Sequence, residues 1–86
     1  MRILVASASK HGSTSEIART IGASLMFRKI DADVVDVGDV ESLDGYGAVV
    51  LGSGIYMGHW MEPAKRFVEH HAAELLVRPG WLFSSG

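Results

Sequence analysis

The 86-residue chain contains no cysteine. This absence excludes disulfides, a thiolate nucleophile and a cysteine-bound metal, and it suits a reducing cytoplasm, where we expect the protein. Long apolar runs are also missing. The first run, Ile3 to Ala6, is too short for the hydrophobic region of a signal peptide, and no later run is long enough to span a bilayer. We therefore expect no integral membrane span.

An excess of charge of either sign is missing as well. Eight Lys and Arg residues against ten Asp and Glu residues give a formal net charge of −2. This balance favours neither a nucleic-acid partner nor a strongly acidic surface. The hydrophobic share of 48% is ordinary for one small globular domain, whose core is marginal at this length.

What the chain does contain is an alternation of apolar strands and amphipathic helices. We predict strands over residues 2–7, 32–37, 47–53 and 81–84, and helices over residues 13–28 and 61–76. Ser13 and Glu16 have the spacing of a capping box, which places the first helix start at Ser13. The central strands are apolar without alternation, which favours a parallel α/β sheet, and the aspartates of residues 32–37 indicate an edge strand.

Three segments follow the carboxyl ends of the predicted strands. In an open parallel sheet, ligands bind beyond these ends, at the point where the strand order reverses. The segments are the parts of the chain richest in glycine, serine and aromatic residues, and they comprise residues 7–14, 52–60 and 84–86. The sequence therefore predicts a ligand site built from all three.

The first of these segments suits an anion. It offers consecutive backbone N–H groups, the hydroxyls of Ser9, Ser13 and Thr14, and the positive end of the helix dipole. Gly12 lets the backbone come close to a ligand. The Walker A sequence and the Gly-x-Gly-x-x-Gly fingerprint are both absent, which favours a terminal phosphate over a pyrophosphate. The alternative is a serine-rich helix cap without a ligand.

The second segment, "GSGIYMGHW", suits a flat ring system, because glycines admit a ring and an aromatic side chain stacks on its face. The alternative is a flexible connector whose aromatic side chains cover the sheet edge. The imidazole of His59 could protonate a bound substrate, although an exposed loop residue is the simpler interpretation. His70 and His71 point apart on a helix, so we predict no metal site.

All three segments resemble the flavin loops of one family. "SKHGST" resembles the phosphate loop of flavodoxins, and "FSSG" is similar to the start of their third flavin loop. "GSGIYMGHWMEPAKRFVEHH" resembles the second flavin loop and the following helix of the flavodoxin-like group that includes protoporphyrinogen dehydrogenases. The resemblance implies FMN as cofactor and a flavodoxin-like α/β fold. Its open parallel sheet would have the order 2-1-3-4, lack the fifth strand and carry helices on both faces.

The resemblance also implies which residues contact FMN. The phosphate would be held by Ser9, Lys10, His11, Gly12, Ser13 and Thr14. The ring and ribityl chain would be lined by Ser53, Gly54, Ile55, Tyr56 and Gly58. The other edge of the ring would be touched by Ser84, Ser85 and Gly86. The stacking aromatic would be Tyr56, with Trp60 as the alternative.

Two jobs are implied by the resemblance: electron transfer, or an FMN-dependent oxidoreductase of the protoporphyrinogen dehydrogenase type from heme biosynthesis that passes electrons to a quinone. Two alternatives stay open, a phosphate-binding or regulatory α/β module without flavin, and an inert fragment that needs a partner chain. The family has a fifth strand and two further helices, so residues 1–86 are expected to be a flavodoxin-like domain without its carboxyl-terminal part. The fourth strand would then be an open apolar edge through which the chain could self-associate.

Overall fold

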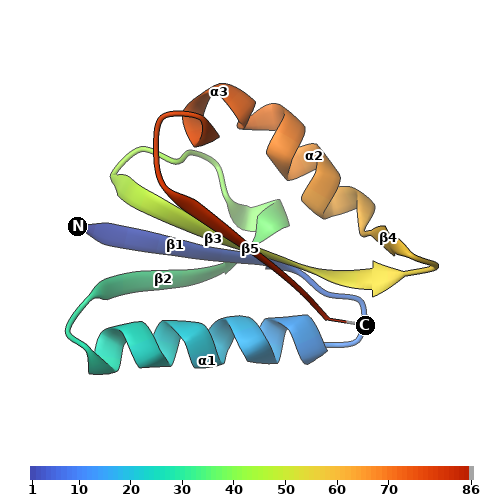
Figure 1. Ribbon diagram of the computed structural model, residues 1–86, viewed down its shortest axis with the longest axis horizontal. Helices are drawn as coiled ribbons and strands as arrows, with labels where there is room; N and C mark the ends of the chain where they lie inside the picture. The colour runs from blue at the N-terminus through green and yellow to red at the C-terminus, as the bar shows by residue number, and fades with distance from the viewer. Residues whose placement is uncertain (86) are drawn as a thin grey trace.

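The computed structural model describes residues 1–85, which form a twisted sheet flanked by helices (Figure 1). Four strands pair in parallel in the order β2-β1-β3-β5, and this confirms the predicted order 2-1-3-4. These strands are β1 (Arg2–Ala8), β2 (Asp31–Asp36), β3 (Tyr46–Tyr56) and β5 (Gly80–Ser85). The short strand β4 (His59–Trp60) pairs antiparallel with the end of β3.

Helices lie on both faces of the sheet, as predicted (Figure 1). The helix α1 (Ser13–Phe27) covers one face, and α2 (Glu62–His70) and α3 (Ala72–Leu75) cover the other. The 3-10 helix η1 (Val37–Asp39) follows β2. Alternate residues of β1 serve the two faces: Leu4 packs with Phe67 of α2 in one core cluster, and Val5 packs with Ala18 of α1 in the other.

The predicted helix over residues 61–76 is in fact two helices that meet at His71. The side chain of His71 is buried, packs against Phe67 with 4.7 Å between ring centroids, and has its Nδ1 3.1 Å from Oε1 of Glu74. This hydrogen bond lowers the pKa of Glu74. The backbone of His71, with φ −107° and ψ 18°, departs from helical values, so α2 ends before this residue and α3 begins after it.

The prediction of a glycine-rich loop over residues 52–60 is wrong, because most of this segment is strand. The third strand continues to Tyr56, beyond the predicted end at residue 53, and the chain then turns back so that Ile55 pairs with Trp60. Met57 and Gly58 have φ angles of 53° and 80°, which is the left-handed pair typical of a two-residue hairpin turn. A hairpin with a two-residue turn therefore stands where the sequence analysis expected a loop.

The edge strand β2 is held by its neighbour β1, by a side chain from β3 and by α1. The hydroxyl of Tyr46 donates to Oδ2 of Asp33 at 2.7 Å, and this bond raises the pKa of Tyr46. On the other side, α1 lies so close to β2 that a Cβ atom added to Gly22 would stand 2.4 Å from Cγ2 of Val34. Glycine at this position is what permits the close packing.

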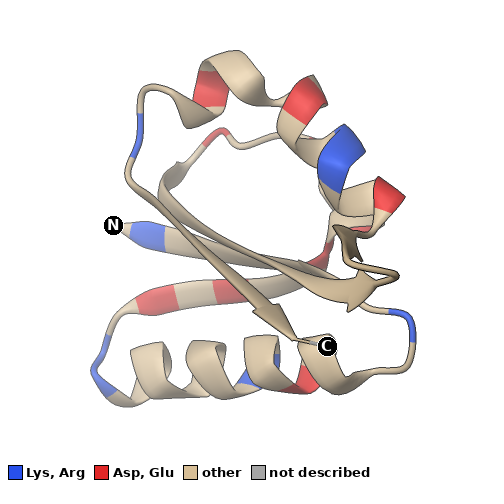
Figure 2. Cartoon of the chain, turned by 45° about the vertical axis from the view of Figure 1, so that its right-hand side comes forward, with Lys and Arg blue, Asp and Glu red and all other residues tan. Residues whose placement is uncertain are grey.

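The opposite edge of the sheet is strand β5, which pairs with β3 on one side only. Trp81 and Leu82 are 58% and 71% exposed there. The strand carries no charged side chain, as the tan ribbon in Figure 2 shows. Self-association through this edge stays a prediction. Within residues 1–85 no helix has the length and apolar character needed to cross a membrane.

The packing of α1 on β2 gives a first testable prediction. We expect Gly22→Ala to lower the free energy of unfolding by about 1 kcal/mol, because overpacking costs about 1–3 kcal/mol and alanine returns only about 1 kcal/mol of helix propensity. With Val34 also changed to alanine the collision is gone, and Gly22→Ala should then stabilise the protein. Urea unfolding of the unaltered protein, the two single variants and the double variant measures both effects. Ser24→Ala, at an exposed position of the same helix, is the control and should change stability equally with Val34 and with Val34→Ala. If Gly22→Ala also had the same effect in both backgrounds, the close approach of α1 to β2 would be contradicted.

Candidate functional site

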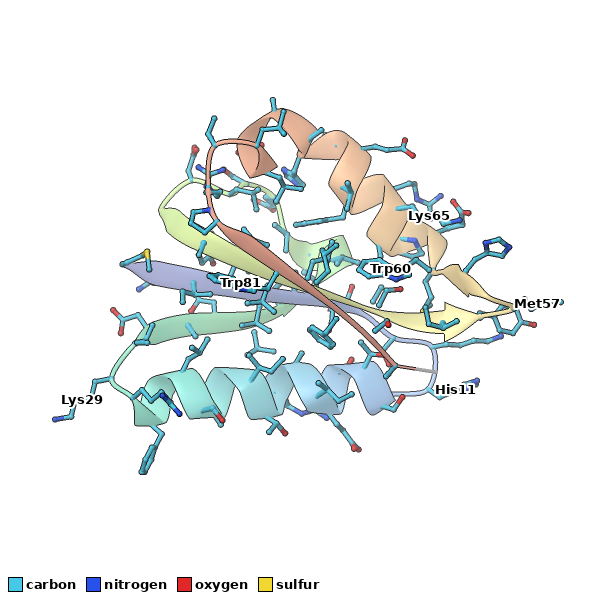
Figure 3. The ribbon with its side chains drawn as sticks, viewed as in Figure 1. His11, Lys29, Met57, Trp60, Lys65 and Trp81 are labelled. Atoms are coloured by element: carbon cyan, nitrogen blue, oxygen red, sulfur yellow. The ribbon has the colours of Figure 1, made fainter. Side chains whose placement is uncertain are left out.

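The three predicted segments meet at the carboxyl edge of the sheet and enclose a cavity of about 90 Å³. In Figure 3 the loop that carries His11 lies beside the carboxyl end of β5. The predicted residues that line the cavity are Ser9, Lys10, His11, Ser13, Thr14, Gly54, Ile55, Tyr56 and Ser85. Residues from all three segments thus share one site.

The first loop is shaped by Gly12, which has a φ of 91° and caps α1. The N–H of Gly12 donates to Oγ of Ser9 at 2.8 Å. The predicted capping box between Ser13 and Glu16 is not formed, because Ser13 is already the first residue of the helix and makes no cap hydrogen bond. The helix start at Ser13 is confirmed, and its hydroxyl lies at the cavity instead of serving the cap.

A hydrogen bond ties the first segment to the third. Oγ1 of Thr14 and Oγ of Ser85 are 2.7 Å apart, although the two residues are separated by 71 positions in the sequence. Thr14 is 1% exposed, and both Thr14 and Ser85 line the cavity. The start of α1 and the end of β5 are therefore fixed relative to each other.

Ser53 has a structural position that the sequence did not indicate. Its side chain is fully buried, donates to the carbonyl of Gly54 at 2.8 Å and accepts from the N–H of Met61 at 3.0 Å. Both bonds are internal, and they join the base of the hairpin to the start of α2. Its assignment to the flavin ring stays a prediction, to which the cavity adds no support.

Three other predicted residues of the described chain do not line the cavity, and one lies outside the description. Gly12 shapes the loop, Gly58 lies at the hairpin turn and Ser84 is exposed on β5. Gly86 is outside residues 1–85. The contacts assigned to these four stay predictions.

Of the two aromatic candidates, Tyr56 lines the cavity and Trp60 does not. Tyr56 is 56% exposed, and Nζ of Lys10 lies 3.7 Å from its ring centroid, which is a cation–π contact. Met61 also lines the cavity and was missed by the sequence analysis. It reaches the site only because the hairpin turns the chain back, and no local signal in the sequence shows that turn.

The fold and the site define a class of protein. A parallel α/β sheet with hydroxyls and amides gathered at its first crossover is the arrangement of doubly wound proteins that bind a phosphate at the switch point. Residues 4–86 match the flavodoxin domain family, and the chain belongs to that family.

Known proteins similar to this chain include an enzyme and several flavodoxins. Protoporphyrinogen IX dehydrogenase [quinone] of Escherichia coli strain K12 is 33% identical over 98% of this chain and 48% of its own length. The chain thus spans about half the length of the curated relatives that it matches. A flavodoxin from the domain Archaea has a TM-score of 0.81 and 23% identity, over 87% of this chain and 54% of that chain.

A mutant flavodoxin of Fusobacterium nucleatum, solved bound to flavin mononucleotide, has a TM-score of 0.78 and 17% identity. The match covers 96% of this chain and 49% of that one. Rubredoxin oxygen:oxidoreductase from Desulfovibrio gigas has a TM-score of 0.84 and 14% identity, over 96% of this chain and 22% of that chain. At these identities the similarity shows the fold.

The buried serine gives a second testable prediction. Ser53→Ala should lower the free energy of unfolding by about 1–3 kcal/mol, because the N–H of Met61 loses its acceptor. Ser84→Ala, on the exposed face of β5, is the matched control and should change stability little. Urea unfolding compares the two variants. Equal stabilities would show that the hydroxyl of Ser53 does not hold the base of the hairpin.

Proposed function

We propose that this protein binds FMN at the cavity and uses it in electron transfer. The observation that carries the proposal is the meeting of the hydroxyl-bearing first loop with Tyr56 and Ser85 at one edge of the sheet. Membership of the flavodoxin domain family supports it, as does the similar fold of a flavodoxin solved with flavin mononucleotide.

The residues present fit the two ends of this cofactor. A cavity of about 90 Å³ is too small for a whole ligand, since small-molecule sites span about 300–1,000 Å³, but it suits a phosphate. Ser13 would hold the phosphate at the positive end of α1 together with Thr14, whose hydroxyl can accept from Ser85 and donate to the phosphate. Lys10 would add a positive charge. Tyr56 is 56% exposed, and its aromatic ring is a surface on which a flavin could stack. The bound flavin would supply the redox chemistry, and the chain would hold and orient it.

We further propose an oxidoreductase role of the protoporphyrinogen dehydrogenase type, with a quinone as the electron acceptor. The support is the 33% identity to the E. coli enzyme over nearly the whole of this chain. A carrier that only passes electrons between proteins is the second role compatible with FMN. A phosphate-binding module without flavin, or a fragment that needs a partner chain, would instead give no flavin binding at all.

The binding of FMN can be tested against riboflavin, which lacks the phosphate. We expect Thr14→Ala to weaken FMN by about tenfold or more, because a hydrogen bond to a charged group contributes about 1.5–3 kcal/mol. The affinity for riboflavin should fall far less. Quenching of flavin fluorescence on titration with the protein measures both dissociation constants.

Two further variants sharpen this comparison. Thr14→Ser keeps a hydroxyl and should retain FMN. Ser15→Ala is the control and should also retain FMN, because Ser15 lines a different cavity with Arg19 and Asp36. Equal losses of FMN and riboflavin in Thr14→Ala would remove the phosphate role from this residue. An unquenched flavin signal with the unaltered protein would refute the FMN proposal as a whole.

The oxidoreductase role has its own test. The protein loaded with FMN should convert protoporphyrinogen IX to the porphyrin when menadione is supplied without oxygen, and the porphyrin fluorescence reports the rate. Free FMN at the same concentration and the protein without FMN are the controls. A rate equal to that of free FMN, with FMN demonstrably bound, would leave electron transfer between proteins as the role.

A further inference from the structure

A second cavity, of about 320 Å³, lies between the hairpin and α2. Its apolar wall is formed by Tyr56, Met57, Trp60 and Met61. Figure 3 shows Trp60 between the sheet and α2, with Met57 at the hairpin tip. The volume falls within the range of about 300–1,000 Å³ that small-molecule sites occupy, and two aromatic side chains give it surfaces for a flat ring.

Positively charged groups outnumber negatively charged groups at this cavity. Lys10 and Lys65 bring positive charge, Glu62 brings the single carboxylate, and His59 adds an imidazole. Nζ of Lys65 lies 3.5 Å from Oε1 of Glu62, but both side chains are well exposed to solvent. An ion pair of this kind contributes little, so the carboxylate of a ligand could replace Glu62 as the partner of Lys65 at small cost.

Lys10 is also placed to pair with the carboxylate of a ligand. Its ammonium group lies over the ring of Tyr56, 3.7 Å from the centroid, and Lys10 lines both cavities. Within residues 1–85, Lys10 forms no ion pair with a carboxylate. Two ammonium groups therefore border an apolar space walled by aromatic rings.

We propose that this second cavity binds a flat aromatic ring that carries a carboxylate. The ring packs against Trp60 and the thioethers of Met57 and Met61, and the carboxylate pairs with Lys65 and Lys10. Apolar packing supplies most of the affinity and the two ammonium groups select the acid over its neutral analogue. The proposal does not depend on FMN, because Trp60, Lys65 and Glu62 do not line the first cavity.

The two tryptophans of the chain make a direct test, since Trp60 lies at the cavity and Trp81 lies on β5. In the ¹⁵N-labelled protein, the two indole N–H signals are assigned with Trp81→Phe. The protein is then titrated with 2-naphthoate and, separately, with the neutral 2-naphthamide. We expect a saturable shift of the Trp60 signal, a nearly unmoved Trp81 signal, and at least fivefold weaker binding of the amide.

Four variants test the charges. Lys65→Met and Lys10→Met should each weaken 2-naphthoate by about threefold, as expected for partly exposed ion pairs, without a change for the amide. Arg66→Met removes the same charge from the next position of α2 and should have no effect, because Arg66 faces a different cavity. Glu62→Gln should strengthen 2-naphthoate by about twofold, a gain that damage to the fold would not produce.

Several outcomes would overturn the proposal. Equal binding of the acid and the amide would remove the carboxylate from the recognition, and equal shifts of both tryptophans would show unspecific binding. A Trp60 signal that does not shift during the titration would show that 2-naphthoate does not bind at this cavity. Titration in the presence of riboflavin separates the two sites: a dissociation constant that rises in proportion to riboflavin would assign the cavity to the flavin, whereas binding that persists supports a second site.

Discussion

The parallel register of three neighbouring strands is the constraint on which the site depends. Ala8 of β1 stands beside Ser53 of β3, and Ser53 stands beside Ser84 of β5, so the three strands run out at the same edge of the sheet. The segments that follow these strands therefore meet at that edge. The hydrogen bond between Thr14 and Ser85 then fixes the first and last of these segments to each other.

The strand order and the two-sided helix cover could be predicted because they depend on long, repeated patterns. Apolar runs without alternation indicate buried parallel strands, and the aspartates of β2 indicate its edge position, which the structure confirms. The errors are all local. Glycines at 52, 54 and 58 look like a loop although the backbone around them is strand and hairpin, and the break at His71 depends on a buried imidazole that no helical pattern shows.

The sequence could predict the part of the candidate site that lies at the carboxyl ends of the strands and in the loops after them. The structure brings Thr14, Tyr56 and Ser85 to one cavity, because the carboxyl ends of parallel strands share an edge. Ser53 shows why the remainder was not predictable. The family resemblance assigns Ser53 to the flavin ring, and the structure adds that its hydroxyl makes two internal bonds that join β3 to Met61. Which of these two uses a hydroxyl has is decided by tertiary contacts alone.

Lys10 and Tyr56 form a wall that belongs to two cavities at once. A molecule bound on either side of that wall would contact the same ammonium group and the same ring. Thermodynamic linkage then requires reciprocity: whatever factor an occupant of one cavity imposes on affinity at the other is imposed in return. If both proposed ligands bind, this pair of side chains is the contact through which their affinities would be coupled.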